Sequence, residues 1–272
     1  MEITLDPYIP EHIIDYFETI SELKASLYGR YLLYHDLDTL VVIGYPLKDE
    51  YDEEELARVI REYWEKYRLR YITVIAPRLP SFFEFEDIQI DEYYRLKLPL
   101  KPLDKKLRYM ISRAEKEIVV EVGKSFSREH RELVEVFLKK EDVKDYMRYI
   151  CSRLDRYLAK SKTVKIITAY NKRGELVGFD ILDLASSKYS FYMFNFIDRE
   201  SNYIPGVSDL LLYNLLKISQ ESGKEYVNMG LGINDGVRRF KLKWGAEAFL
   251  PYQYGTIKHG EVSELLEFFS RL

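Results

Sequence analysis

A strand that turns directly into a helix is the feature that most restricts how this chain can fold, and it lies in GLGINDGVRRFKLKWGA, residues 230–246. Gly230 and Gly232 let the backbone leave strand geometry, and Asn234 is of a residue type favoured at the start of a helix. Apolar side chains at positions i, i+3 and i+7 predict one buried face, made of Val237, Phe240 and Trp244. The cations of this segment point away from that face: Arg238, Arg239, Lys241 and Lys243. They form either a solvated helix surface or a site for an anionic partner.

Composition limits the functions that fit. The chain has 272 residues and a net charge of −4, which does not suit a general nucleic-acid-binding protein, DNA-binding proteins included, with its usual basic excess. No apolar run approaches the ~20 residues of a membrane span, and the acidic N-terminus lacks the pattern of a secretion signal. The single cysteine, Cys151, excludes an internal disulfide and indicates a cytoplasmic location. The four histidines lie far apart in the sequence, so no metal site is expected.

Strands and helices alternate through the first half, which favours an α/β fold with mixed sheets. The expected strands are TLVVIGYP (39–46), YITVIAP (71–77) and EYYRLKL (92–98). A helix is expected over 52–67, where apolar residues recur at i, i+3, i+4 and i+7. A second helix over 103–114 leads to a short strand, IVVEVG (118–123), and we place a domain boundary near Gly123.

The second half opens with helices and continues with a three-stranded meander. Ser127 is expected to cap one helix, and a second is expected over 143–157. The meander strands are expected at 163–170, 175–184 and 188–198, with the turn NKRG between the first two. A loop over 202–208, a helix ending near Glu221, a strand over 226–229 and a closing helix over 262–272 complete the pattern.

The loop YIPGVS, Tyr203–Ser208, meets a helix at Gly206. A glycine at a helix N-terminus lets backbone N–H groups approach a phosphate, and the helix dipole favours the negative charge. An ordinary turn with Ser208 as the helix cap explains the same residues, and Asp209 in the first turn opposes an anion. Cations also gather on the helix over 103–114 and beside it: Lys101, Lys105, Lys106, Arg108, Arg113 and Lys116. They form a solvated face, or a surface for a phosphate-bearing substrate or a tRNA acceptor arm.

The order of elements in the second half resembles the GNAT acyltransferase fold. The phosphate loop of that fold, Q/R-x-x-G-x-G/A, corresponds to Tyr203–Ser208, in which Gly206 is retained and Tyr203 and Ser208 replace the usual residues. The last GNAT motif, N-x-x-A-x-x-hydrophobic-Y-x-K-x-G, corresponds in register to residues 234–245. Lys241 then stands at the position of the general-acid tyrosine.

RFK followed by an aromatic residue and glycine resembles the C-terminal domains of Fem-type peptidoglycan aminoacyltransferases and the related domain of phosphatidylglycerol lysyltransferases. KLRYMISRAEKE, residues 106–117, resembles the basic inter-domain helix of that group. The resemblance implies two tandem GNAT-like domains, a degenerate one over 1–123 and a second over 124–272 that carries the site.

The implied reaction moves an acyl group from a CoA thioester or an aminoacyl-tRNA to the amine of a small molecule or peptide, without a tightly bound cofactor. Lys241 would stabilise the developing oxyanion, and it would act as an acid only if its pKa were lowered. The loop residues Tyr203, Gly206, Val207 and Ser208 would bind the co-substrate. The candidates for substrate binding are Asn195, Asn228, Asn234, Arg238, Arg239 and Trp244.

Several alternatives remain open at this stage. No general base stands out, and the nearby carboxylates are Asp180, Asp183 and Asp198. The chain could instead be a catalytically inactive relative that binds a phosphorylated small molecule or a protein partner. A peripheral protein that acts on lipid head groups is a further alternative, by analogy with the lysyltransferases.

Overall fold

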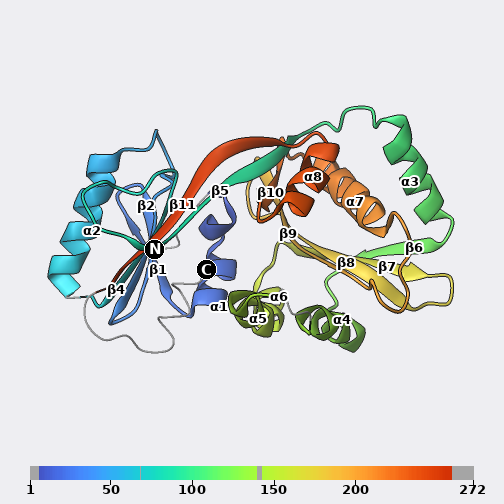
Figure 1. Cartoon of the computed structure of the whole chain (residues 1–272), viewed down its shortest axis with the longest axis horizontal. Helices are drawn as coiled ribbons and strands as arrows, with labels where there is room; N and C mark the ends of the chain where they lie inside the picture. The colour runs from blue at the N-terminus through green and yellow to red at the C-terminus, as the bar shows by residue number, and fades with distance from the viewer. Residues whose placement is uncertain (1–5, 68, 140–142, 259–272) are drawn as a thin grey trace.

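A computed structural model describes residues 6–67, 69–139 and 143–258 (Figure 1). Its strands are β1 (Lys24–Tyr28), β2 (Tyr31–His35), β3 (Thr39–Ile43), β4 (Tyr71–Ala76), β5 (Glu86–Lys97), β6 (Ile118–Gly123), β7 (Val164–Asn171), β8 (Leu176–Asp183), β9 (Tyr189–Ile197), β10 (Tyr226–Leu231) and β11 (Glu247–Lys258). Its helices are η1 (Pro10–His12), α1 (Ile14–Ser21), α2 (Glu53–Tyr67), α3 (Lys105–Glu115), α4 (Arg128–Leu138), α5 (Asp145–Ser152), α6 (Leu154–Lys160), α7 (Val207–Glu221) and α8 (Asp235–Lys243). The strands form one mixed sheet in the order β1-β2-β3-β4-β11-β5-β10-β9-β8-β7-β6.

The same supersecondary unit occurs twice along the chain. In the first half β1, β2 and β3 form an antiparallel meander, α2 follows, and β4 lies parallel to β3. In the second half β7, β8 and β9 form a meander, α7 follows, and β10 lies parallel to β9. Parallel strands that follow each other in the chain need a crossover connection, and α2 and α7 provide it. The chain is therefore an α/β protein built from two similar halves.

The two halves exchange the strands that follow these units. β5 comes after β4 in the sequence but pairs with β10, and β11 comes after β10 but pairs with β4. β5 and β11 also pair with each other, so these two long strands join the halves at the centre of the sheet (Figure 1). Each half therefore completes its part of the sheet with a strand from the other half: β11 pairs with β4, and β5 pairs with β10.

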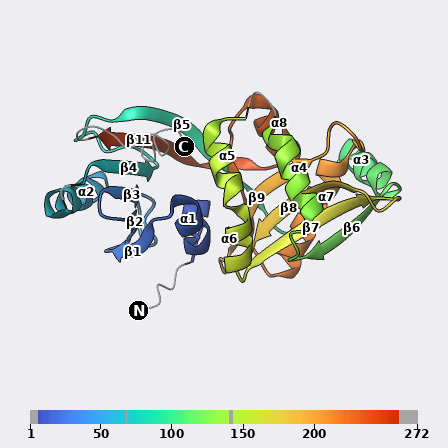
Figure 2. The same ribbon diagram turned by 90° about the horizontal axis from the view of Figure 1, so that it is seen from below.

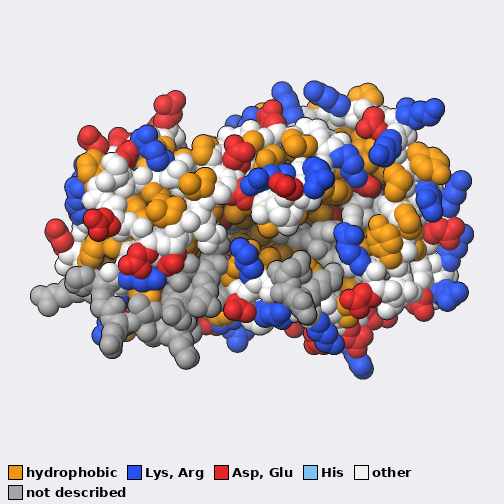
Figure 3. All heavy atoms as spheres, in the orientation of Figure 1, with side chains coloured by type: hydrophobic (Ala, Val, Ile, Leu, Met, Phe, Trp, Pro, Cys, Tyr) orange, Lys and Arg blue, Asp and Glu red, His pale blue; other side chains and the backbone are white. Residues whose placement is uncertain are grey.

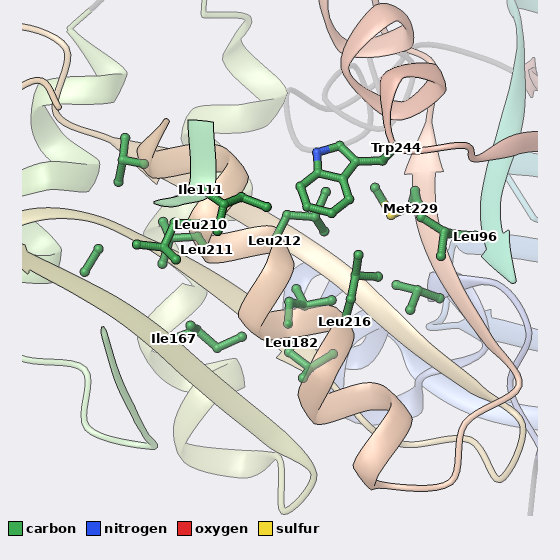
Figure 4. Close-up of a cluster of buried hydrophobic side chains, with 14 of the residues drawn as sticks. Leu96, Ile111, Ile167, Leu182, Leu210, Leu211, Leu212, Leu216, Met229 and Trp244 are labelled. Atoms are coloured by element: carbon green, nitrogen blue, oxygen red, sulfur yellow. The ribbon is translucent and has the colours of Figure 1, made fainter. Parts of the chain in front are cut away.

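Helices cover both faces of the sheet (Figure 2). In the first half α2 covers one face and α1 the other, because apolar residues of each strand alternate between the two sides. In the second half α3 and α7 pack on one face and α4 to α6 on the other. Leucines of α7, including Leu211 and Leu212, lie between the sheet and α3, and Trp244 packs near Leu212 (Figure 4).

Several elements differ from the sequence-based expectations. The helix expected over 143–157 is two helices, α5 and α6, separated at Arg153, whose backbone leaves helical geometry at ψ 1°. The expected strand over 92–98 is the second part of the longer β5, and β11, β1, β2 and α1 had not been anticipated. The expected helix over 262–272 lies outside the described residues. The domain boundary near Gly123 stays a prediction, and β6, which ends there, pairs with β7 of the second half.

Candidate functional site

The candidate site begins where two parallel strands separate. β10 pairs with β9 only from Tyr226 to Asn228, opposite Tyr189 to Phe191. Beyond these residues β10 continues along β5 with a bulge between Asn228 and Gly230. β9 continues along β8 with a bulge of its own between Tyr192 and Phe194. We call this place the β9–β10 divergence, and it leaves one edge of each strand without a strand partner.

Lys241 lies at this divergence. α8 starts where Asn234 caps it by accepting a hydrogen bond from the backbone N–H of Val237 at 3.0 Å. Two turns later Lys241 points back to β10, where its Nζ donates to the carbonyl of Leu231 and lies 5.6 Å from the centre of the Tyr94 ring. The amine also lies beside Gly230, where an added Cβ would be in ordinary contact with Nζ at 3.9 Å. The Lys241 residue is only 3% exposed.

Burial changes the acidity of Lys241. Desolvation lowers its pKa from 10.5 to about 7, and the negative charge of Asp91 only partly opposes this shift. The sequence-based expectation placed Lys241 among the cations that point away from the buried face, and that expectation is wrong for this residue. Val237 and Phe240 are half-buried, whereas Trp244 is buried as expected.

Asp91 of β5 holds the turn that precedes α8. Its carboxylate accepts hydrogen bonds from the backbone N–H groups of Gly232 (3.2 Å) and Ile233 (2.7 Å). It also accepts one from Arg238 Nη2 at 3.3 Å. A Cβ at Gly232 would lie 2.5 Å from this carboxylate, so a side chain there would have to displace Asp91 and Arg238. Arg238 is therefore held by a carboxylate of the chain, and Arg239 is exposed with its Nε bonded to the Asp235 carbonyl at 3.1 Å.

Asp209 joins the first turn of α7 to the end of α8. Its Oδ1 accepts hydrogen bonds from Lys243 Nζ and from Trp244 Nε1, the latter at 3.0 Å. Asp209 is 6% exposed and its bond with Trp244 is buried, whereas Lys243 is itself exposed. Trp244 therefore has a packing and positioning role, and α7 and α8 are fixed relative to each other beside the β9–β10 divergence.

Gly206 is the N-cap of α7 and adopts a left-handed backbone with φ 93°. A Cβ there would lie 2.7 Å from the Met110 carbonyl of α3, so close packing of α3 on α7 requires the glycine. The N–H of Val207 donates to the Ile204 carbonyl, and the side chain of Ser208 does not cap the helix. Tyr203 lines a polar pocket of about 330 Å³ with residues of the β7–β8 turn, including Lys172 and Arg173. The structure thus separates Tyr203 from the buried Gly206 and Val207.

The two asparagines predicted on strands lie on opposite faces of the sheet. Asn195 donates to Asp180 Oδ1 at 2.6 Å, on the face covered by α7. Asn228 is fully buried, donates to the Tyr8 carbonyl at 2.8 Å and accepts from the Gly230 N–H at 2.7 Å. Asn228 therefore holds the bulge of β10 from the face of the sheet opposite α7, and it does not face Lys241.

Cations gather on the surface over α3 and α8. Figure 3 shows many Lys and Arg side chains over the half of the molecule that contains these helices. The α3 residues Lys105, Lys106 and Arg113 are exposed, and within the described part of the chain they form no ion pair. This surface leaves both sequence-based interpretations open, a solvated face or a contact for a phosphate-bearing partner.

The sequence-based expectations gave no role to Asp91 and Tyr94, and Asp209 was expected only to oppose an anion. Asp91, Asp209 and Tyr94 are far from the motif in sequence, and only the exchange of β5 and the packing of α7 bring them to α8. Among residues 6–67, 69–139 and 143–258, no group of three or more His, Cys, Asp or Glu side chains is arranged to hold a metal ion. In that same part, no helix combines the length and apolar character needed to cross a membrane.

Solved structures with a similar arrangement include GNAT proteins. No protein-family model and no curated protein matches the sequence. L-PGS from Bacillus licheniformis has 18% identity and a TM-score of 0.58, with 100% of this chain and 98% of that one covered. A tandem GNAT protein from the clavulanic acid biosynthesis pathway has 13% identity and a TM-score of 0.54, covering 96% and 92%. A conserved protein of unknown function from Bacteroides thetaiotaomicron VPI-5482 has 12% identity and a TM-score of 0.65, covering 94% of each chain. The chain has the tandem GNAT-like fold.

Proposed function

We propose that this protein is an acyl- or aminoacyl-transferase that moves an acyl group from a CoA thioester or an aminoacyl-tRNA to an amine. The observation that carries the proposal is the burial of Lys241 at the β9–β10 divergence, with a pKa of about 7. Two other cations of the same helix are paired with carboxylates, since Arg238 binds Asp91 and Lys243 binds Asp209. A buried lysine costs stability, and such residues are typical of functional sites.

The lowered pKa suits two roles in acyl transfer. The charged form donates a strong hydrogen bond to an oxyanion, and the neutral form results when the proton passes to a leaving sulfur or oxygen. An ordinary lysine holds its proton too tightly for the second role at neutral pH. The acyl carbonyl would lie at the divergence, near the place now occupied by the Leu231 carbonyl that accepts from Nζ.

A transfer assay tests the proposal. Labelled acyl-CoA and aminoacyl-tRNA are offered with amine acceptors to the wild type, to Lys241→Ala and to Lys217→Ala, which removes an exposed cation of α7. Loss of one donor to the oxyanion typically lowers the rate by ~10²–10³-fold, and we expect this loss only for Lys241→Ala. Equal rates for the wild type and Lys241→Ala would remove Lys241 from the mechanism.

The packing of α3 on α7 favours a second function, that of an inactive binding protein. The Met110 carbonyl lies against Gly206, and Asp209 places a negative charge in the turn where GNAT-like folds would receive a phosphate. A thermal-shift screen with CoA, nucleotides and charged tRNA separates the two functions. A nucleotide that raises the Tm and is never turned over would favour the binding protein.

A further inference from the structure

A carboxylate beneath α7 has the properties of a proton acceptor for this reaction. Asp180 of β8 is fully buried, yet its Oδ2 has no hydrogen-bond partner among the described residues. Its Oδ1 accepts from Asn195 Nδ2 at 2.6 Å and from the Tyr192 hydroxyl at 3.5 Å. A buried carboxyl oxygen without a partner is costly, and in a native structure it calls for a specific explanation.

The bulge in β9 creates this cluster. In a regular strand, residues three apart lie on opposite faces. The extra residue at Met193 changes the register, so that Leu182 pairs with Tyr192 and Asp180 pairs with Asn195. Tyr192 and Asn195 therefore lie on the same face as Asp180. Both belong to the part of β9 that has separated from β10, so the cluster borders the β9–β10 divergence.

The other two candidate carboxylates have complete structural roles. Asp183 accepts from the Thr163 hydroxyl at 2.6 Å, from the Ala185 N–H at 2.9 Å and from the Tyr157 hydroxyl. Asp198 accepts three backbone N–H groups of the turn that follows β9, at 2.9 to 3.1 Å. Asp180 alone of the three retains an unused carboxylate oxygen.

The groups that face Asp180 keep its environment apolar. From α7 come leucines such as Leu211 and Leu215, and Ile167 of β7 lies opposite it in the sheet. His130 of α4 lies on the other face, bonded to Thr168. The negative charge of Asp209, in α7, acts on Tyr192 and helps to raise the pKa of its hydroxyl. Burial consequently raises the pKa of Asp180 to about 8, and Asn195 and Tyr192 only partly oppose the rise.

We infer that Asp180, acting through the Tyr192 hydroxyl, accepts the proton that the acceptor amine must lose before it attacks. Asp180 is a positioning residue, because it has no exposed surface and reaches the substrate only through Tyr192, which is half-buried. The inference rests on the proposed transfer reaction. Hydrogen bonds of catalytic groups are often long in the absence of substrate, as the 3.5 Å contact is.

The proton balance is complete. An N–H proton of the acceptor ammonium passes to the Tyr192 oxygen while the Tyr192 hydroxyl proton passes to Asp180. The free amine forms a bond to the acyl carbon, and the C–S or C–O bond to the donor breaks. Lys241 protonates the leaving sulfur or oxygen and takes a proton from the new amide nitrogen. Tyr192 keeps a proton throughout, because burial and the Asp180 charge hold its pKa well above 10.

Two acceptors of different basicity test the relay. Glycinamide must lose a proton to react, whereas hydroxylamine is largely unprotonated at neutral pH. Transfer from labelled acetyl-CoA and from labelled lysyl-tRNA to each acceptor is measured from pH 6 to 9 for the wild type, Asp180→Asn, Asp180→Glu and Tyr192→Phe, with the uncatalysed rate subtracted. Lys217→Met, an exposed change on α7, is the control.

We expect Asp180→Asn and Tyr192→Phe to lower transfer to glycinamide by ~10²–10⁴-fold and to spare most of the transfer to hydroxylamine. Asp180→Glu should restore part of the glycinamide rate. Equal losses of rate with both acceptors would show that the cluster is merely structural. A Tyr192→Phe variant that transfers to glycinamide at the wild-type rate would show that no proton passes through Tyr192. Both results overturn the inference. No transfer by the wild type from either donor would overturn the proposed function and the inference with it.

Discussion

Replacing Lys241 by methionine should make the protein more stable at neutral pH. The Lys241 pKa falls from 10.5 in the unfolded chain to about 7 in the folded protein. Between these values the unfolded state binds the proton and the folded state does not, so stability rises as the pH rises from 7 to 10.5. Below pH 7 both states are protonated and the folded state carries the whole penalty. The shift of roughly 3.5 units corresponds to an upper value of ~5 kcal/mol, at ~1.4 kcal/mol per unit.

Methionine keeps the length of the buried stem and removes the charge, so Lys241→Met should escape this penalty. Its cost is the lost hydrogen bond to the Leu231 carbonyl, ~1 kcal/mol. Urea unfolding of the wild type, Lys241→Met and the exposed control Lys217→Met is followed at pH 6.5, 7.5, 8.5 and 9.5. The free-energy difference between Lys241→Met and the wild type should shrink by about 1.4 kcal/mol for each pH unit above 7. A difference that does not vary with pH would refute the burial of an ionisable amine at this place.

Three further changes test the packing around the site. Gly206→Ala should lower the free energy of unfolding by at least ~2 kcal/mol, because the side chain meets the Met110 carbonyl and the φ of 93° disfavours it; unchanged urea unfolding would contradict this. Asp209→Asn should cost ~1–3 kcal/mol and alter the Trp244 fluorescence; an unaltered emission would show that the bond between α7 and α8 does not hold the indole. Residues 1–123 expressed alone should lack native circular dichroism, since β4 loses its partner β11; a cooperative unfolding transition would contradict the exchange of strands.

The order of strands and helices in the second half could be predicted from the sequence, because the signals for these elements are local. The meander over β7 to β9, the helix after Gly206 and the cap at Asn234 each rest on residues that are neighbours in the chain. The exchange of β5 and β11 could not be read in this way. β11 contains Pro251 and Gly255, residues that argue against a strand. Pro251 is tolerated because it precedes the pairing with β4, which begins at Gln253.

The candidate site was only partly accessible from the sequence for the same reason. The register of the last motif singled out Lys241, but the periodicity of the helix grouped it with exposed cations. Its amine is buried where β10 has its bulge, beside Tyr94 of β5, which is distant in the sequence. Asp180 was one of three equivalent carboxylates in the sequence, and only the bulge of β9 and the missing partner of Oδ2 distinguish it.

A crystal structure of the protein with a non-hydrolysable analogue of the donor that supports transfer would show whether the acyl group binds beside Lys241. We predict that the acyl carbonyl lies at the β9–β10 divergence, with its oxygen about 3 Å from Lys241 Nζ. Lys241 Nζ should then donate a hydrogen bond to the acyl oxygen, and the Leu231 carbonyl should no longer be its one acceptor. An analogue bound elsewhere, with Lys241 still turned to Leu231 as it is now, would contradict the assignment of this place as the site of acyl transfer.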